Sequence, residues 1–206
     1  MEQLRATAGQ DYSKSLFFRL RTAGALAHAL WHAAEFGDPQ AAVSLSDAVH
    51  LLDETLGPDH PRTLTARVGL AVAYQDTGRL KEAIDLHEQN LADSERILGP
   101  DNPDTLVSRV GLAHAYQDTG RLKEAVPLFE RYLADCERIL GPDNLDTLTA
   151  RGGLAHAYES AGRINEAIDL YEQNLADCER VLGPDNLDTL AGQPRSEERR
   201  VGKECR

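Results

Sequence analysis

The sequence predicts an all-α solenoid of repeated helix pairs, because one short motif recurs at a fixed spacing and the segments between its copies have helical periodicity. One copy, Leu-Gly-Pro-Asp-Asn-Pro-Asp-Thr-Leu, occupies residues 98–106. Its glycine, Gly99, has counterparts at Gly57, Gly141 and Gly183, so each copy lies 42 residues after the one before. A period of this size is typical of a solenoid, in which each unit packs against its neighbours.

Each copy of the motif contains residues that end one helix and begin the next. Glycine accepts the positive φ found just past a helix end, and the proline that follows, such as Pro100, cannot continue that helix. A few residues later, Asn102 can cap a new helix and Pro103 suits its first position. His60 and Pro61 offer the same combination in the preceding copy. The motif therefore predicts a helix on either side of it.

The segments between the motifs have the apolar spacing of amphipathic helices. In the middle unit, residues 103–118 form the expected first helix, called helix A, which ends near Gly120. Residues 121–140 form the expected helix B, in which apolar residues recur at helical spacing. These residues are Leu122, Ala125, Val126, Phe129, Leu133, Cys136, Ile139 and Leu140. The other two units carry the same pattern in register.

The periodicity divides the chain into an irregular beginning, three regular repeats and a remainder. Upstream of the first motif, two segments of helical spacing are separated by Gly37-Asp38-Pro39 and are interpreted as a diverged helix pair. The predicted organisation is a flexible arm at residues 1–10, the diverged pair at 11–56, repeats at 57–98, 99–140 and 141–182, the start of a truncated repeat at 183–190, and a disordered tail at 191–206.

The pattern Leu-Ala-x-Ala-Tyr, then Gly-Arg-Leu-x-Glu-Ala, then Tyr or Phe, resembles the tetratricopeptide repeat (TPR). The long helix B and the Leu-Gly-Pro-Asp linker are similar to the kinesin-light-chain type of this repeat, which is abundant in bacterial multidomain proteins. The resemblance is strong over residues 57–190 and weak over 11–56. It implies a right-handed superhelix of antiparallel helix pairs, with helix A on the concave face and helix B on the convex face.

The end of the chain departs from the repeat pattern. Residues 195–206 are charged, lack an apolar stripe, and resemble the in-frame translation of a common sequencing-library adapter. We therefore exclude them from the fold prediction. The alternative is a natural basic tail that contacts nucleic acid. If the adapter interpretation holds, helix B of the last full repeat lacks its next neighbour, and self-association through this uncapped end is expected.

Composition excludes several classes of function. The 206 residues are 41% hydrophobic, which is enough for a core in one elongated domain. The net charge of −12 argues against binding to nucleic acid or to an anionic membrane, because both require a basic face. No apolar run approaches the roughly 20 residues that span a bilayer. Residues 1–5 do not resemble a secretory signal, so a cytoplasmic location is expected.

Neither a metal site nor a cofactor is predicted. Cys136, Cys178 and Cys205 are too scattered for a disulfide framework or a zinc site, and the first two are expected to be small buried side chains. His28 and His32 have the spacing of metal ligands, but no third ligand is identifiable, so packing or solvated histidines are the alternative. Nearly every polar residue recurs in register, and no catalytic arrangement breaks the repeat symmetry.

An arginine recurs once in every regular unit, at Arg67, Arg109 and Arg151. One hypothesis is a positive strip that binds a ligand carboxylate. The favoured hypothesis is pairing inside the solenoid with acids of the linkers. The candidates are Asp59, Asp101, Asp143, Asp104 and Asp146.

The resemblance places the ligand groove on the exposed positions of the A helices. Peptide-binding members of the family carry Asn with Lys or Arg there, whereas these positions contain no Lys or Arg and replace the asparagines by Val-Gly or Gly-Gly. The candidate groove residues are Val68, Val72, Gln75, Asp76, Val107, Val110, His114, Gln117, Asp118, His156 and Glu159. Burying an anionic ligand against valines and acids would leave its charge unpaired. The ligand is therefore predicted to be apolar or basic, with the glycines leaving room for a bulky side chain.

The predicted function is a non-enzymatic scaffold that binds a peptide or helix of a partner protein in this groove. A second hypothesis is a sensor or regulatory segment of a larger NTPase-coupled signalling protein. An enzyme is the third and least favoured hypothesis, because no phosphate loop, nucleophile arrangement or convergent carboxylate pair is present.

Overall fold

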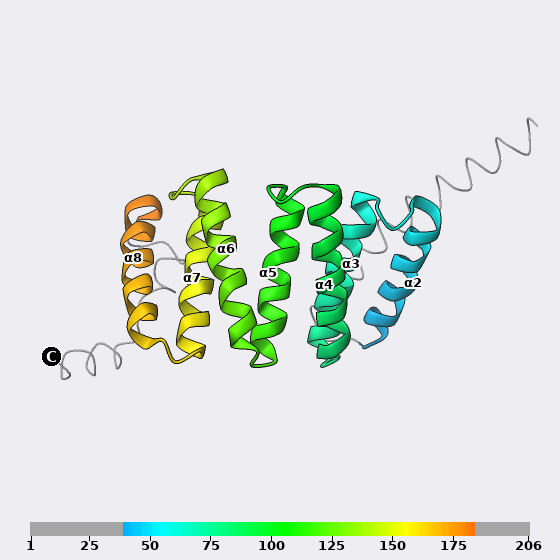
Figure 1. The fold of residues 1–206 in the computed structure, drawn as a ribbon, viewed down its shortest axis with the longest axis horizontal. Helices are drawn as coiled ribbons and strands as arrows, with labels where there is room; N and C mark the ends of the chain where they lie inside the picture. Colours follow the sequence, from blue (N-terminus) through cyan, green and yellow to red (C-terminus); the bar gives the residue numbers. More distant parts are fainter. Residues whose placement is uncertain (1–38, 184–206) are drawn as a thin grey trace, which may run out of the picture. The chain divides into compact units, whose positions relative to one another are not determined.

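The computed structural model describes residues 39–183, and every regular element in this range is an α-helix (Figure 1). The expected arm, the first helix of the diverged pair and the tail lie outside the described residues. The helices, labelled as in Figure 1, are α2 Pro39–Leu56, α3 Pro61–Asp76, α4 Leu80–Ile97, α5 Pro103–Asp118, α6 Leu122–Leu140, α7 Leu145–Ser160 and α8 Ile164–Leu182. Thus α3, α5 and α7 are the A helices, and α2, α4, α6 and α8 are the B helices.

The chain divides into two compact units between Thr119 and Gly120. In unit 1, α2 packs on α3, α3 on α4, and α4 on α5; in unit 2, α6 packs on α7 and α7 on α8. Fully buried alanines lie where helices meet, for example Ala83 in α4 and Ala125 in α6. A methyl side chain lets neighbouring helices approach closely, so these positions fix the helix packing.

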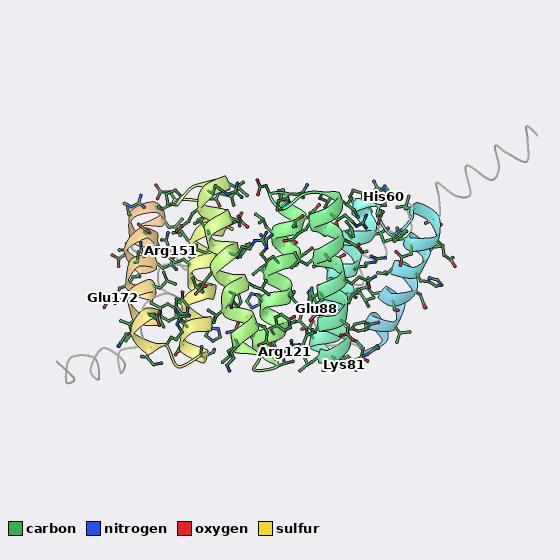
Figure 2. The ribbon with its side chains drawn as sticks, in the orientation of Figure 1. His60, Lys81, Glu88, Arg121, Arg151 and Glu172 are labelled. Atoms are coloured by element: carbon green, nitrogen blue, oxygen red, sulfur yellow. The ribbon has the colours of Figure 1, made fainter. Side chains whose placement is uncertain are left out.

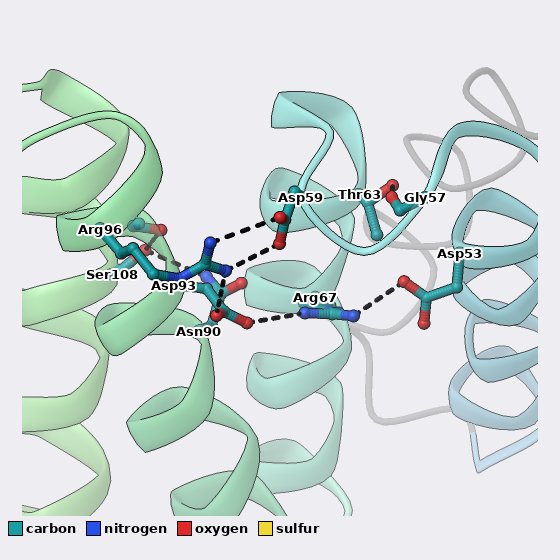
Figure 3. Close-up of polar contacts among 10 residues, drawn as sticks. Asp53, Gly57, Asp59, Thr63, Arg67, Asn90, Asp93, Arg96 and Ser108 are labelled. Carbon is teal, nitrogen blue, oxygen red and sulfur yellow. Dashed lines mark hydrogen bonds and ion pairs between the residues drawn. The ribbon is translucent and has the colours of Figure 1, made fainter.

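The linkers between units of the repeat are held by a threonine that sequence analysis had not explained. Thr63 Oγ1 donates a hydrogen bond to the Gly57 carbonyl at 3.0 Å (Figure 3). Thr105 bonds to the Gly99 carbonyl in the same way at 2.8 Å. Both threonines are fully buried, so this bond satisfies a hydroxyl that has no access to water.

The predicted caps are present at each A helix. His60 Nδ1 accepts from the Arg62 amide at 3.1 Å, and Asn102 Oδ1 accepts from the Asp104 amide at 2.9 Å. Gly99 has a φ of 89°, which strongly favours glycine, so the linker can turn only because this residue has no side chain. The prediction that one motif ends a helix and begins the next is confirmed.

The tight turns between helices A and B use a second glycine. At Gly78, φ is 75°, and the Arg79 amide donates to the Tyr74 carbonyl at 2.8 Å, five residues back. This is the hydrogen bond of a Schellman motif, which satisfies one of the free carbonyls at the end of α3. The Arg79 guanidinium lies 4.0 Å from the centre of the Tyr74 ring, and this cation–π contact covers the turn.

Candidate ligand-binding face

The A helices of unit 1 expose one continuous set of the predicted groove positions. On α3, Val68, Val72 and Gln75 are half-buried and Asp76 is exposed. On α5, Val110 and Gln117 are half-buried, whereas Val107, His114 and Asp118 are exposed. We call these nine residues the unit 1 A-face. It combines valines with carboxylates and contains no lysine or arginine.

Gln75 connects the two helices of the unit 1 A-face. Its Nε2 donates to Asp118 Oδ2 at 2.9 Å, and its Oε1 lies 3.0 Å from Nε2 of His87 on α4. Because the amide group of Gln75 donates to the carboxylate, its oxygen must accept from the imidazole. These two bonds hold the Gln75 side chain in one orientation and position the Asp118 carboxylate.

Unit 2 carries the two remaining candidates. His156 and Glu159 are both exposed on α7. The hydroxyl of Tyr171 on α8 donates to Glu159 Oε2 at 3.2 Å. Tyr171 and Glu159 stand at the repeat positions of His87 and Gln75, so a contact from helix B to the end of helix A occurs in both units.

His87 is a residue that sequence analysis missed. It occupies the position that Phe129 and Tyr171 hold in the next two repeats, and its side chain is fully buried. Its Nδ1 has no hydrogen-bond partner among the described residues. Burial, with a smaller contribution from the charge of His114, lowers the pKa of His87 from 6.5 to about 4. The signal that could have revealed His87 is a histidine where the other repeats have an aromatic ring.

The lowered pKa of His87 predicts a pH-dependent stability. Between pH 6.5 and pH 4 the unfolded chain binds this proton and the folded chain does not, so stability is full above this window and falls as the pH decreases. The expected loss is about 2 kcal/mol between pH 7 and pH 5. Urea unfolding of the unsubstituted protein and of His87→Phe, each at pH 7 and at pH 5, measures this loss of stability. An equal loss in the variant would assign the effect to other groups.

Nearly every polar residue recurs in register, but a buried polar cluster at the α4–α5 contact is an exception. Asn90 and Ser94 of α4 and Ser108 of α5 are buried together. Asn90 Nδ2 donates to Ser108 Oγ at 3.1 Å, and the hydroxyl oxygens of Ser94 and Ser108 are 3.4 Å apart. In the next repeat, Tyr132 stands at the position of Asn90 and Cys136 at the position of Ser94. Sequence analysis missed this cluster because its members lie on two helices and meet only when α4 packs on α5.

The glycines of the A helices are occupied by the protein itself. A Cβ placed on Gly111 would lie 2.7 Å from Cε1 of His87, and one placed on Gly153 would lie 3.5 Å from Cε1 of Phe129. The expectation that these glycines leave room for a ligand side chain is therefore wrong at both positions. The rings of helix B fill that space, and the valines remain as the apolar contacts of the unit 1 A-face.

The arginine ladder pairs inside the protein, but with different acids from those expected. Arg67 contacts Asp53 on α2 at 2.8 Å and Asp93 on α4 at 3.3 Å (Figure 3). Arg151, labelled in Figure 2, contacts Glu137 on α6 at 3.1 Å and Asp177 on α8 at 2.6 Å. Arg67 and Arg151 thus link their A helices to the B helices on both sides, and Arg109 on α5 contacts Glu95 on α4 at 2.9 Å.

The linker acids pair with a separate, exposed set of arginines. Arg96 contacts Asp59 at 2.8 Å and Asp93 at 2.9 Å, as Figure 3 shows. Arg180 contacts Asp143 and Asp177 in the same arrangement in unit 2. The hydrogen bond from Arg96 holds the pKa of Asp59 below its usual range. The ladder arginines are buried in these networks and are not available as a strip for a ligand carboxylate.

The remaining candidate residues are two cysteines and two histidines. Cys136 and Cys178 are buried free thiols, as predicted. His28 and His32 lie outside the described residues. Within residues 39–183, no group of three or more His, Cys, Asp or Glu side chains could hold a metal ion. None of the helices described is long and apolar enough to cross a membrane.

These features define an all-helical repeat protein in which A and B helices alternate and in which Arg67 and Arg151 each join three helices. A family model described as Tetratricopeptide repeat matches residues 20–92, 65–137 and 110–176. The chain belongs to the tetratricopeptide repeat family, and the all-α TPR solenoid predicted from the sequence is confirmed. No curated protein sequence matches the chain.

Several solved structures have the same fold. A Podosopora anserina protein with nearly identical TPR-like repeats, assigned as a kinesin light chain, is 33% identical with a TM-score of 0.73. The match covers 84% of this chain and 82% of that one. A Rap protein complexed with competence and sporulation factor is 16% identical, with a TM-score of 0.64, over 84% of this chain and 51% of that one. The second likeness shows the fold alone.

Proposed function

We propose that the chain is a non-enzymatic scaffold that binds a peptide or helix of a partner protein on the unit 1 A-face. The family supports this proposal, because TPR proteins are generally protein–protein interaction scaffolds. The observation that carries it is the valine surface of α3 and α5, which has acids at one end and contains no lysine or arginine among its nine residues. The corresponding residues of α7, His156 and Glu159, are proposed to contact the same kind of ligand.

The chemistry of the face favours an apolar or basic ligand. Val107 is 49% exposed, so covering it and its neighbours would remove apolar surface from water. Asp76 and Asp118 are exposed carboxylates that would attract a cationic ligand and speed its association. An acidic ligand would meet the exposed carboxylate of Asp118, at a cost of several kcal/mol if both charges were buried together.

A peptide array with acidic, neutral and basic sets, matched in apolar content and tested at two salt concentrations, checks this proposal. Basic amphipathic peptides are expected to bind best and to weaken as salt rises. Asp118→Asn combined with Val110→Asp is expected to weaken the best peptide by about tenfold or more. Val43→Asp, at a 50% exposed valine on α2, is the matched control. Preferential binding of acidic peptides, or unchanged binding by the double variant, would contradict the proposal.

A regulatory segment of an NTPase-coupled signalling protein is the second candidate. A Rap protein with this fold is complexed with competence and sporulation factor, so the fold is compatible with binding such a ligand. In that case binding would change the activity of a coupled NTPase. The reading frame on both sides of this stretch of the gene, in its natural context, distinguishes the two candidates. A cytoplasmic location is proposed for either one.

A further inference from the structure

The contact between α4 and α5 is polar at positions where the equivalent contacts are apolar. The structure describes three contacts between a B helix and the A helix that follows it: α2 with α3, α4 with α5, and α6 with α7. At the α4–α5 contact, four repeat positions hold the fully buried side chains of His87, Asn90, Ser94 and Ser108. The same positions hold Leu45, Ala48, Leu52 and Ala66 at the α2–α3 contact, and Phe129, Tyr132, Cys136 and Ala150 at the α6–α7 contact.

Two acceptor atoms at the α4–α5 contact lack a hydrogen-bond donor. His87 Nδ1 and Asn90 Oδ1 are buried and have no partner among the described residues. The proton of the neutral His87 ring is on Nε2, which donates to Gln75, so Nδ1 is an acceptor. A buried acceptor without a donor loses its hydrogen bonds to water and gains none in the protein. Both atoms therefore favour separation of α4 from α5, because separation exposes them to water.

The hydrogen bonds that do form at these positions contribute little net stabilisation to the α4–α5 contact. Asn90 Nδ2 donates to Ser108 Oγ at 3.1 Å, and the hydroxyl oxygens of Ser94 and Ser108 are 3.4 Å apart. The Ser108 hydroxyl donates to the Asp104 carbonyl of its own helix at 2.9 Å, so Ser94 must be the donor to Ser108. Water can replace the bonds between the two helices when they separate, whereas it cannot replace the apolar burial of the other two contacts.

Separation of α4 from α5 would also divide the unit 1 A-face. Gln75 of α3 contacts both helices, because its Oε1 accepts from His87 on α4 and its Nε2 donates to Asp118 on α5. Since α3 packs on α4, movement of α5 away from α4 breaks the bond between Gln75 and Asp118. The valines of α3 and α5 then no longer form one surface. A ligand that contacts both helices binds only the closed contact and shifts the equilibrium toward it.

We propose that the α4–α5 contact opens more readily than the α2–α3 and α6–α7 contacts, and that a ligand on the unit 1 A-face holds it closed. The opening follows from the buried polar residues of α4 and α5 and does not depend on the proposed function. The effect of the ligand rests on the proposed function. The contact is thus a conformational switch: its closed form presents the valines and Asp118 as one surface, and its open form does not.

Labelling of a buried thiol measures the opening. Ser94→Cys places a cysteine at the α4–α5 contact, at the repeat position that Cys136 holds in the α6–α7 contact. Both positions are fully buried, so iodoacetamide reaches either thiol only when its contact opens. Mass spectrometry of peptides gives each labelling rate, which is divided by the rate of the same thiol in urea-unfolded protein. The thiol of Ser94→Cys is expected to react about tenfold or more faster than that of Cys136. An equal or lower rate would overturn the proposal.

Exchange of the polar residues tests whether they cause the opening. In the Ser94→Cys protein, His87→Phe, Asn90→Tyr and Ser108→Ala complete the residue set of the α6–α7 contact. Labelling is expected to slow by about tenfold, to the rate of Cys136. Ser108→Ala alone removes the acceptor of Asn90 Nδ2 and is expected to accelerate labelling by about fivefold. This single change covers the case in which the larger exchange fails to fold, which circular dichroism detects. Unchanged labelling in either folded variant would overturn the proposal.

The effect of a ligand is measured with the best basic amphipathic peptide from the array. Saturating peptide is expected to slow labelling of the Ser94→Cys thiol by about tenfold and to leave the rate of Cys136 unchanged. A peptide that binds, as fluorescence anisotropy shows, without slowing this labelling would overturn the closing role of the ligand, and so would equal slowing at both thiols. Absence of binding by every peptide would contradict the proposed function and the closing role together, while labelling without peptide still decides whether the contact opens.

Discussion

Replacing Arg67 with alanine is expected to lower the free energy of unfolding by about 3 kcal/mol. The side chain of Arg67 is only 7% exposed and joins α3 to Asp53 on α2 and to Asp93 on α4. Its removal leaves two acids without this cation and opens a cavity between three helices. Urea unfolding, fitted with a common m-value if the transition stays two-state, measures the change.

Arg96→Ala is the matched control for this prediction. Arg96 also contacts two aspartates, but its side chain is 57% exposed, so its removal is expected to cost less than about 1 kcal/mol. Equal losses for the two variants would mean that burial of the Arg67 network does not stabilise unit 1. The account of the arginine ladder as the link between helices would then be wrong.

Gly111→Ala is expected to destabilise the protein by about 2 to 3 kcal/mol, whereas Gly153→Ala is expected to be neutral or to stabilise it by up to about 1 kcal/mol. Both glycines stand at the same repeat position. The added methyl would lie 2.7 Å from the His87 ring in one case and 3.5 Å from the Phe129 ring in the other. Only the second distance is an ordinary contact that lets the higher helix propensity of alanine take effect.

Thermal unfolding of the two variants measures this difference. Its cause is tested by making Gly111→Ala in a protein that already carries His87→Ala. In His87→Ala, the ring that Gly111→Ala would meet is absent, so the additional loss is expected to become small. If Gly111→Ala costs the same in both backgrounds, contact with His87 is not the reason that glycine is required there.

The sequence alone predicted the helices because their signals are local. Positive-φ glycine, proline and an asparagine cap lie within a few residues of each helix end, and the fixed period repeats them. The caps at His60 and Asn102 could be named before the structure for this reason. Helix packing then follows from apolar stripes that recur in register.

The partners of Arg67 and Arg151 could not be predicted in the same way. The linker acids are closer in sequence, but the arginines reach acids 14 and 26 residues away, on the flanking B helices. Side-chain direction across a helix interface decides this pairing, and sequence spacing does not report it. His87 was missed for a related reason, since its fit against Gly111 depends on the distance between two helices.

The unit 1 A-face is the part of the candidate site that sequence reasoning located from the family resemblance. The structure adds the bond between Gln75 and Asp118, which positions a carboxylate, and it removes the glycines from the list of contacts available to a ligand. Ligand binding on this face is what we propose, and the function that we infer for the chain depends on it.

The most direct test of that claim is an NMR titration of the full chain with the best basic amphipathic peptide from the array. We expect saturable chemical-shift changes at Val68, Val72, Val110 and His114, and their loss in the combined Asp118→Asn and Val110→Asp variant. A saturating peptide that leaves the resonances of α3 and α5 unchanged would contradict it.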